Sequence, residues 1–171
     1  MGLNISRRHL IALTAAAATA TSVTAAATIY SWWRIPPAQN YVVLADEEIL
    51  FVQALSATAY PAGSATPLNG KEAQIDRYFD QILANMSGNN PHLLKLLLHF
   101  LDNLPLTTHL TSFSQASTTT QQAIFNDWFS SDQYLLRNAI QSLVILLGMG
   151  YTTHPKIASK LAPFHRCGFG R

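Results

Sequence analysis

Residues 90–104 read Asn-Pro-His-Leu-Leu-Lys-Leu-Leu-Leu-His-Phe-Leu-Asp-Asn-Leu, and this stretch decides the fold. Asn90 suits a helix cap and Pro91 the first helical position. Apolar side chains then cover nearly the whole circumference, which predicts a helix buried in the core or against another chain. The stretch is too short to cross a bilayer, which needs about 20 residues. The sequence therefore predicts a helical protein organised around an interior helix.

Helical periodicity recurs on both sides of this stretch. Ile75, Phe79 and Ile82 follow one another at spacings of four and three, which places them on one helix face. Only residues 41–44 have the alternation of a strand. We therefore predict an all-α fold, an irregular bundle of about five to six helices after an N-terminal export leader. The remaining helices are expected at 46–60, 71–86, 118–129, 132–149 and 155–161.

Helix boundaries follow from capping and breaking residues. Acidic residues 46–48 suit the first turn of a helix, because the helix dipole favours negative charge there. Ser117 and Ser131 are expected N-caps for the helices that follow them. Gly148 and Gly150 are expected to weaken the end of the 132–149 helix.

Composition limits the function. The chain has 171 residues, of which 12% are charged, compared with about 25% in ordinary soluble domains. This deficit indicates that a partner covers part of the surface. The formal charge of +2 and the absence of a basic stripe exclude nucleic-acid binding.

The N-terminus resembles a twin-arginine export signal. Ser6, Arg7, Arg8 and Leu10 match its pattern of a small hydroxyl residue, two arginines, any residue and apolar residues. A weakly apolar run rich in Ala and Thr follows. The resemblance implies export of an already folded protein by the twin-arginine machinery to the periplasm, or to the periplasmic face of the inner membrane.

Two fates of the leader remain open. Ala25 and Ala27 stand in the relation that a signal peptidase requires, which favours cleavage. Residues 10–33 carry no charge and are long enough to span a bilayer, which would retain the leader as an anchor. We assign residues 1–33 to a signal or anchor, 34–45 to a linker and 46–171 to the helical small-subunit domain.

The body, residues 44–161, resembles the gluconate 2-dehydrogenase subunit 3 family. The similarity lies in Leu44-Ala-Asp-Glu-Glu with its apolar helix ending at Tyr60-Pro-Ala-Gly, in Ile75-Asp-Arg-Tyr-Phe-Asp, and in Phe113, Trp128 and the helix before Tyr151-Thr-Thr-His-Pro. The resemblance implies a non-catalytic accessory subunit of a flavin-dependent dehydrogenase of the glucose-methanol-choline type. Such a subunit binds the catalytic subunit, supports its maturation and carries it through the membrane.

Cofactors are expected in the partners alone. The resemblance implies FAD in the catalytic subunit and haem in a multihaem cytochrome c subunit. The sequence here has no phosphate-binding glycine loop and no Cys-x-x-Cys-His motif. His99 and Asp102 share a helix face but lack a third metal ligand at suitable spacing. We therefore expect no catalytic, cofactor-binding or metal site in this chain.

Three residues are candidate partner contacts. Trp128 and Phe129 are adjacent, so they cannot both face the same side of a helix, and one of them is free to meet a partner. Cys167, the single cysteine, has no internal disulfide partner; an intersubunit disulfide and a free thiol remain alternatives. Two other functions also remain: a membrane-anchored helical scaffold protein of the cell envelope, and an exported enzyme.

Overall fold

The computed structural model describes residues 31–32, 34–63 and 66–161. The chain divides into two units, residues 1–35 and residues 36–171. In the first unit Ser31 and Trp32 are helical, and the Arg34 amide donates to the Ser31 carbonyl at 3.0 Å. The second unit contains the helices on which the rest of the description depends.

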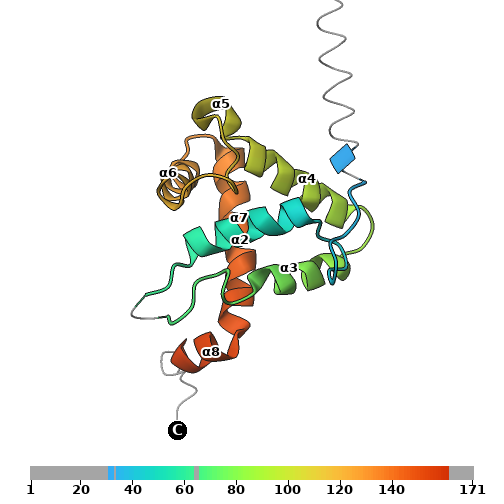
Figure 1. Cartoon of the computed structure of the whole chain (residues 1–171), viewed down its shortest axis with the longest axis vertical. Helices are drawn as coiled ribbons and strands as arrows, with labels where there is room; N and C mark the ends of the chain where they lie inside the picture. Colours follow the sequence, from blue (N-terminus) through green and yellow to red (C-terminus); the bar gives the residue numbers. More distant parts are fainter. Residues whose placement is uncertain (1–30, 33, 64–65, 162–171) are drawn as a thin grey trace, which may run out of the picture. The chain divides into compact units, whose positions relative to one another are not determined.

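The second unit is helical throughout its regular structure, and no strand occurs in the described ranges. This confirms the all-α prediction. Figure 1 shows the helices in chain order. They are α2 (Asp46–Ala59), α3 (Ile75–Ala84), α4 (Asn90–Asn103), α5 (Leu106–His109), α6 (Thr118–Phe129), α7 (Tyr134–Thr153) and α8 (Pro155–Leu161).

Helix α2 is the centre of the packing, since it contacts α3, α4, α6 and α7. Figure 1 shows it crossing the long α7, with α3 and α4 to either side. Phe51, Val52 and Leu55 of α2 are almost completely buried. At roughly 1.5–3 kcal/mol for each fully buried apolar side chain, this face supplies much of the driving force for packing.

An aromatic row joins α2 to α6. The Phe51 and Phe113 rings meet edge to face with centroids 5.6 Å apart. Phe113 also stacks on Trp128 at 5.1 Å. Phe113 lies in the polar connection before α6 and is fully buried, so it fixes this irregular segment against the core.

The segment before α2 is bound to α3 by one carboxylate. Asp80 accepts hydrogen bonds from the amides of Val42, Val43 and Leu44 at 2.8–2.9 Å. These amides are therefore satisfied by a side chain, and residues 41–44, which have the alternation of a strand, form none. Although the sequence placed 34–45 in a linker, residues 41–45 thus pack with the helical unit, and Leu44 is completely buried.

Several helix ends differ from the sequence predictions. Ser117 caps α6, since its side chain accepts from the Thr120 amide. Helix α7 begins at Tyr134 and not at Asp132, because Ser131 accepts from the Gln133 amide and holds a turn there. Helix α3 begins at Ile75, because Gln74 takes a left-handed backbone conformation with a φ of 52°.

The prediction for the end of α7 was wrong: the helix runs through both glycines to Thr153. A Cβ on Gly148 would lie 2.4 Å from the Tyr60 hydroxyl oxygen, and one on Gly150 would lie 2.4 Å from the Tyr78 ring. The glycines are therefore places of close packing within the helix. Tyr60 uses that space to donate to the Val144 carbonyl at 2.6 Å.

Candidate functional site

The export-signal residues Ser6, Arg7, Arg8 and Leu10 lie outside the described residues, as does Cys167. The structure therefore bears only on the other two candidate contacts. Trp128 is a core residue, since only 6% of its surface is exposed and it stacks on Phe113. Phe129 is 41% exposed and contacts the ring of Phe125, so it is the aromatic that a partner can reach.

A continuous exposed stripe runs along α7. Its members recur at spacings of three and four residues, which places them on one helix face. Leu135 and Ile145 are among the most exposed large apolar side chains of the described chain, at 81% and 67%. No member carries a charge. We call this surface the α7 stripe; it consists of Leu135, Asn138, Ser142, Ile145, Met149 and Thr152.

A second apolar surface lies on α4. Leu93 and Phe100 are 56% and 54% exposed, and the half-buried Leu96 lies between them at helical spacing. The sequence predicted a helix hidden on every side, and the structure buries only one side of it. A partner covering this face would account for the rest of its apolar character.

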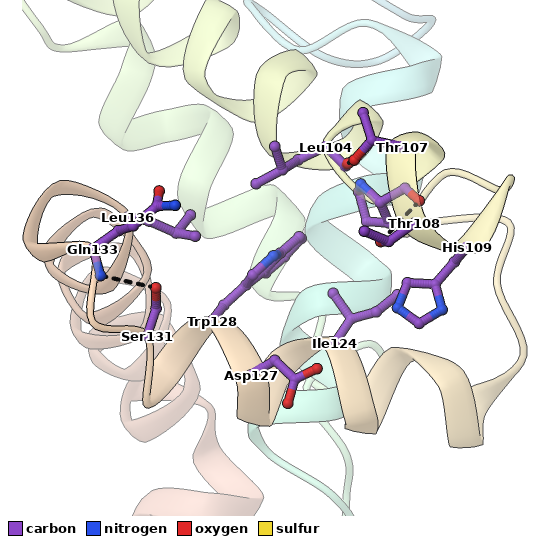
Figure 2. A pocket seen from close by; sticks show the side chains of 11 residues that line it. Leu104, Thr107, Thr108, His109, Ile124, Asp127, Trp128, Ser131, Gln133 and Leu136 are labelled. Atoms are coloured by element: carbon purple, nitrogen blue, oxygen red, sulfur yellow. Dashed lines mark hydrogen bonds between the residues drawn. The ribbon is translucent and has the colours of Figure 1, made fainter.

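A pocket of about 300 Å³ lies between the end of α4, α5, α6 and the start of α7. Apolar side chains line it together with hydroxyl, amide, imidazole and carboxylate groups. Figure 2 shows Trp128 projecting from α6 into this space, between Leu136 and Ile124. We call it the Trp128 pocket. Its lining is Leu104, Pro105, Thr107, Thr108, His109, Ile124, Asp127, Trp128, Ser131, Gln133 and Leu136.

The indole N–H of Trp128 has no acceptor among the described residues. It is also not sealed in the core, because it is not among the fully enclosed side-chain polar atoms of the described ranges that lack a hydrogen bond. A buried tryptophan usually places its N–H against a partner. The indole N–H of Trp128 is therefore accessible to solvent.

A buried charged cluster joins α2 and α4. Glu48 contacts Lys95 Nζ at 3.4 Å and His99 Nε2 at 3.0 Å, and it accepts from the Ala45 amide at 2.7 Å. Lys95 also donates to the Val43 carbonyl at 3.0 Å. Every oxygen and charge in this set is matched, which is the arrangement of a structural ion-pair network.

Asp102 of α4, which shares a helix face with His99, is bonded to the connection before α6. Its carboxylate accepts from the Ser114 amide at 2.8 Å and the Ser114 hydroxyl at 3.1 Å. Burial raises the pKa of Asp102 above its ordinary value, although these hydrogen bonds and His99 act in the opposite direction. A cleft of about 260 Å³ beside it is lined by Glu47, His99 and Ser112 among others.

Residues 31–32, 34–63 and 66–161 contain no group of three or more His, Cys, Asp or Glu side chains placed to hold a metal ion. In the same ranges no helix has both the length and the apolar character needed to cross a membrane.

Sequence reasoning missed the α7 stripe and the Trp128 pocket. The stripe could have been found from the sequence, because Arg137 is the only charged residue among residues 134–153, which form a 20-residue helix. The pocket could not, because its lining comes from four helices. Comparison with protein-family models, curated proteins and solved structures finds no match for this chain.

Proposed function

We propose that this chain is a non-catalytic accessory subunit of a flavin-dependent sugar or alcohol dehydrogenase of the glucose-methanol-choline type. It binds the catalytic subunit in the cytoplasm, supports its maturation and accompanies it to the periplasm on a twin-arginine leader. FAD belongs to the catalytic subunit, and haem to a multihaem cytochrome c subunit that receives the electrons.

The α7 stripe is the observation that carries the proposal. Leu135, Ile145 and Met149 are all more than half exposed on one helix face without an intervening charge. A large uncharged surface of this kind is typical of a protein that works within a complex. The family resemblance of residues 44–161 supplies the identity of the partner, and the arginine pair at 7–8 supplies the route.

The first experiment is co-purification. The tagged full-length chain, expressed in its native host, is expected to elute with a flavoprotein that is recognised by its flavin absorbance and by mass spectrometry. An eluate without flavin and without a large partner would contradict the proposal and would favour the anchored scaffold. The intact mass of the chain in the same eluate shows whether the leader has been removed.

A variant pair tests the surface. Ile145→Lys places a charge in the middle of the α7 stripe and should reduce the captured flavoprotein at least about tenfold, as expected for a central interface residue. Gln122→Lys places the same charge on an exposed position of α6 and should leave capture unchanged. Both variants should keep the melting curve of the unaltered chain, because surface substitutions cost about 0.5 kcal/mol or less.

A second pair tests export. Replacing Arg7 and Arg8 together by lysine should leave both the chain and the flavoprotein in the cytoplasm, since the arginine pair is the feature that the receptor reads. His9→Ala, which alters the unconstrained neighbouring position, is the control. Periplasmic flavoprotein at an unchanged level in the lysine variant would show that the partner does not depend on this leader.

A further inference from the structure

The α7 stripe has the spacing of a coiled-coil seam. From Leu135 to Thr152 its six members follow one another at intervals of 3, 4, 3, 4 and 3 residues, which is the a and d pattern of a heptad repeat. The opposite side of the helix carries Ile140 and Leu147 into the core, so the seam points away from the core. At about 1.5 Å per residue the seam is roughly 26 Å long. Its length and spacing suit one long helix of another molecule.

The side chains of the seam are complementary to themselves in a two-fold symmetric pair. When two α7 helices lie antiparallel and are centred between residues 143 and 144, each large apolar member stands opposite a smaller or polar member of the second copy. Each such pair occurs twice, because in a two-fold interface residue i contacts residue j and j contacts i. Alternation of large and small side chains lets the two helices interlock. The pairs are Leu135 with Thr152, Met149 with Asn138, and Ile145 with Ser142.

The charges around α7 favour the same arrangement. Asp132 precedes the helix by two residues and Lys156 follows it by three, and both are exposed. An antiparallel pair brings the Asp132 end of one copy beside the Lys156 end of the second, whereas a parallel pair would bring like charges together. Opposite charges across an interface select orientation and partner. The rows that flank the seam are uncharged and set up no repulsion; they are Tyr134, Gln141 and Gly148 on one side and Ala139, Leu146 and Thr153 on the other.

We propose that two copies of this chain associate through the α7 stripe, antiparallel and two-fold symmetric, whenever no other partner occupies it. The self-complementary sizes and the matched charges at the ends single out a second copy as the occupant. The dimer does not depend on the proposed function. The flavoprotein of that function uses the same stripe, so its binding separates the two copies. The dimer thus covers the exposed apolar residues until the catalytic subunit binds.

Sedimentation equilibrium of the full-length chain tests the association. The unaltered chain should dimerise with a Kd of roughly 10–100 µM, because three large apolar side chains from each copy make a small interface. Ile145→Lys places a lysine of each copy near the two-fold axis and should raise this Kd at least about tenfold. Gln122→Lys, an exposed position of α6, adds the same charge away from the seam and should leave the Kd unchanged.

Disulfide trapping tests the orientation. In a Cys167→Ser background, a chain with Asn138→Cys is mixed with a differently tagged chain with Met149→Cys. An antiparallel pair places these positions in one layer, so mild oxidation should give the mixed disulfide. Each chain alone should give little, because identical positions then lie about 16 Å apart, beyond the Cα separation of about 7 Å that a disulfide can bridge. Efficient disulfides within each single variant would indicate a parallel pair and would overturn the inference.

A charge exchange tests the matched ends. Asp132→Lys and Lys156→Asp should each weaken the association about two- to fivefold at low salt, the modest effect of solvated charge pairs. The two substitutions combined in one chain should restore the Kd of the unaltered chain, because each end again carries opposite charges. A combined variant that associates more weakly than either single variant would contradict the arrangement. Melting curves recorded below the Kd, where the chain is monomeric, show that each variant remains folded.

Co-purification separates this inference from the proposed function. If the unaltered chain captures the flavoprotein but stays monomeric well above the expected Kd, the accessory role stands and the dimer does not. If it dimerises through α7 but captures no flavoprotein, the proposed function fails and the dimer remains. Association that Ile145→Lys leaves unchanged would place the contact elsewhere and would overturn the inference. The disulfide-trapped dimer should capture no flavoprotein until it is reduced, and undiminished capture would contradict the competition for the stripe.

Discussion

The two halves of the helical unit are held together by different forces. Residues 36–103, the polar half, contain ten charged residues, while residues 104–161, the apolar half, contain five. In the polar half Asp80, Glu48 and Lys95 are buried and hydrogen-bonded. The apolar half is held by ring stacking within it, and its helix α7 packs on the polar half through close contacts at glycines, stacking of Tyr60 on Tyr151 and a hydrogen bond from a tyrosine hydroxyl.

The difference shows how each half can be altered. Directional hydrogen bonds to a buried charge fail when one partner is removed, because the other partner stays buried and unsatisfied. Apolar contacts depend on the shape of the buried side chains. The outer face of a helix such as α7 takes no part in them, so it can carry other residues. The apolar half therefore combines a fixed interior with the α7 stripe, the surface that we propose for partner binding.

The largest expected effect is at Asp80. Asp80→Ala removes the acceptor of three backbone amides in the polar half and should lower the free energy of unfolding by about 3–5 kcal/mol, measured by urea denaturation. Asp132→Ala, an exposed aspartate of the apolar half, should change it by about 0.5 kcal/mol or less. Equal effects of the two substitutions would remove the distinction between the halves.

The second effect tests close packing in the apolar half. Gly150→Ala brings a methyl group within 2.4 Å of the Tyr78 ring and should lower the free energy of unfolding by about 1–3 kcal/mol. Gly63→Ala, where no atom lies within 4 Å of the new Cβ, should be neutral or slightly stabilising. Stabilisation by Gly150→Ala would mean that helix propensity outweighs the contact.

A smaller effect is expected at the cap of α6. Ser117→Ala removes the side-chain acceptor of the Thr120 amide and should cost about 1 kcal/mol in thermal or chemical unfolding. Ser142→Ala makes the same chemical change at an exposed position inside α7, where alanine is the better helix former, and should not destabilise the protein. A loss at Ser142 as large as that at Ser117 would contradict the capping role.

The smallest effect is a dependence on pH at Asp102. Its pKa is raised in the folded protein, mainly by burial, so folding favours the protonated carboxyl. That contribution is complete below the unfolded pKa of about 3.9 and is lost as the pH rises through the raised folded value. Asp102→Asn cannot ionise, so its free energy of unfolding should rise relative to the unaltered protein between pH 4 and pH 7. A fall over this interval would contradict the direction.

Most of the helices could be predicted because their signals are local. The apolar spacing of 118–129 with the Ser117 cap, and the acidic first turn at 46–48, each act within a few residues of sequence. The starts of α3 and α7 were shifted by local conformation at Gln74 and Ser131. The end of α7 was predicted wrongly because distant residues act there: its glycines accommodate Tyr60 and Tyr78 of other segments.

The candidate site shows the same division. From the sequence, one of Trp128 and Phe129 had to face outward, because adjacent helix positions point in different directions. The choice between them was settled by Phe113, which stacks on Trp128 and leaves Phe129 exposed.

The sequence by itself determined the all-α class, most helix positions and the low charge of residues 134–153, because periodicity and capping are properties of neighbouring residues. Only the tertiary structure decided which faces are buried, where glycine is required and which polar groups are satisfied. These depend on contacts between segments far apart in the chain, such as the 36 positions that separate the Leu44 amide from Asp80. Such distances in sequence leave no local pattern.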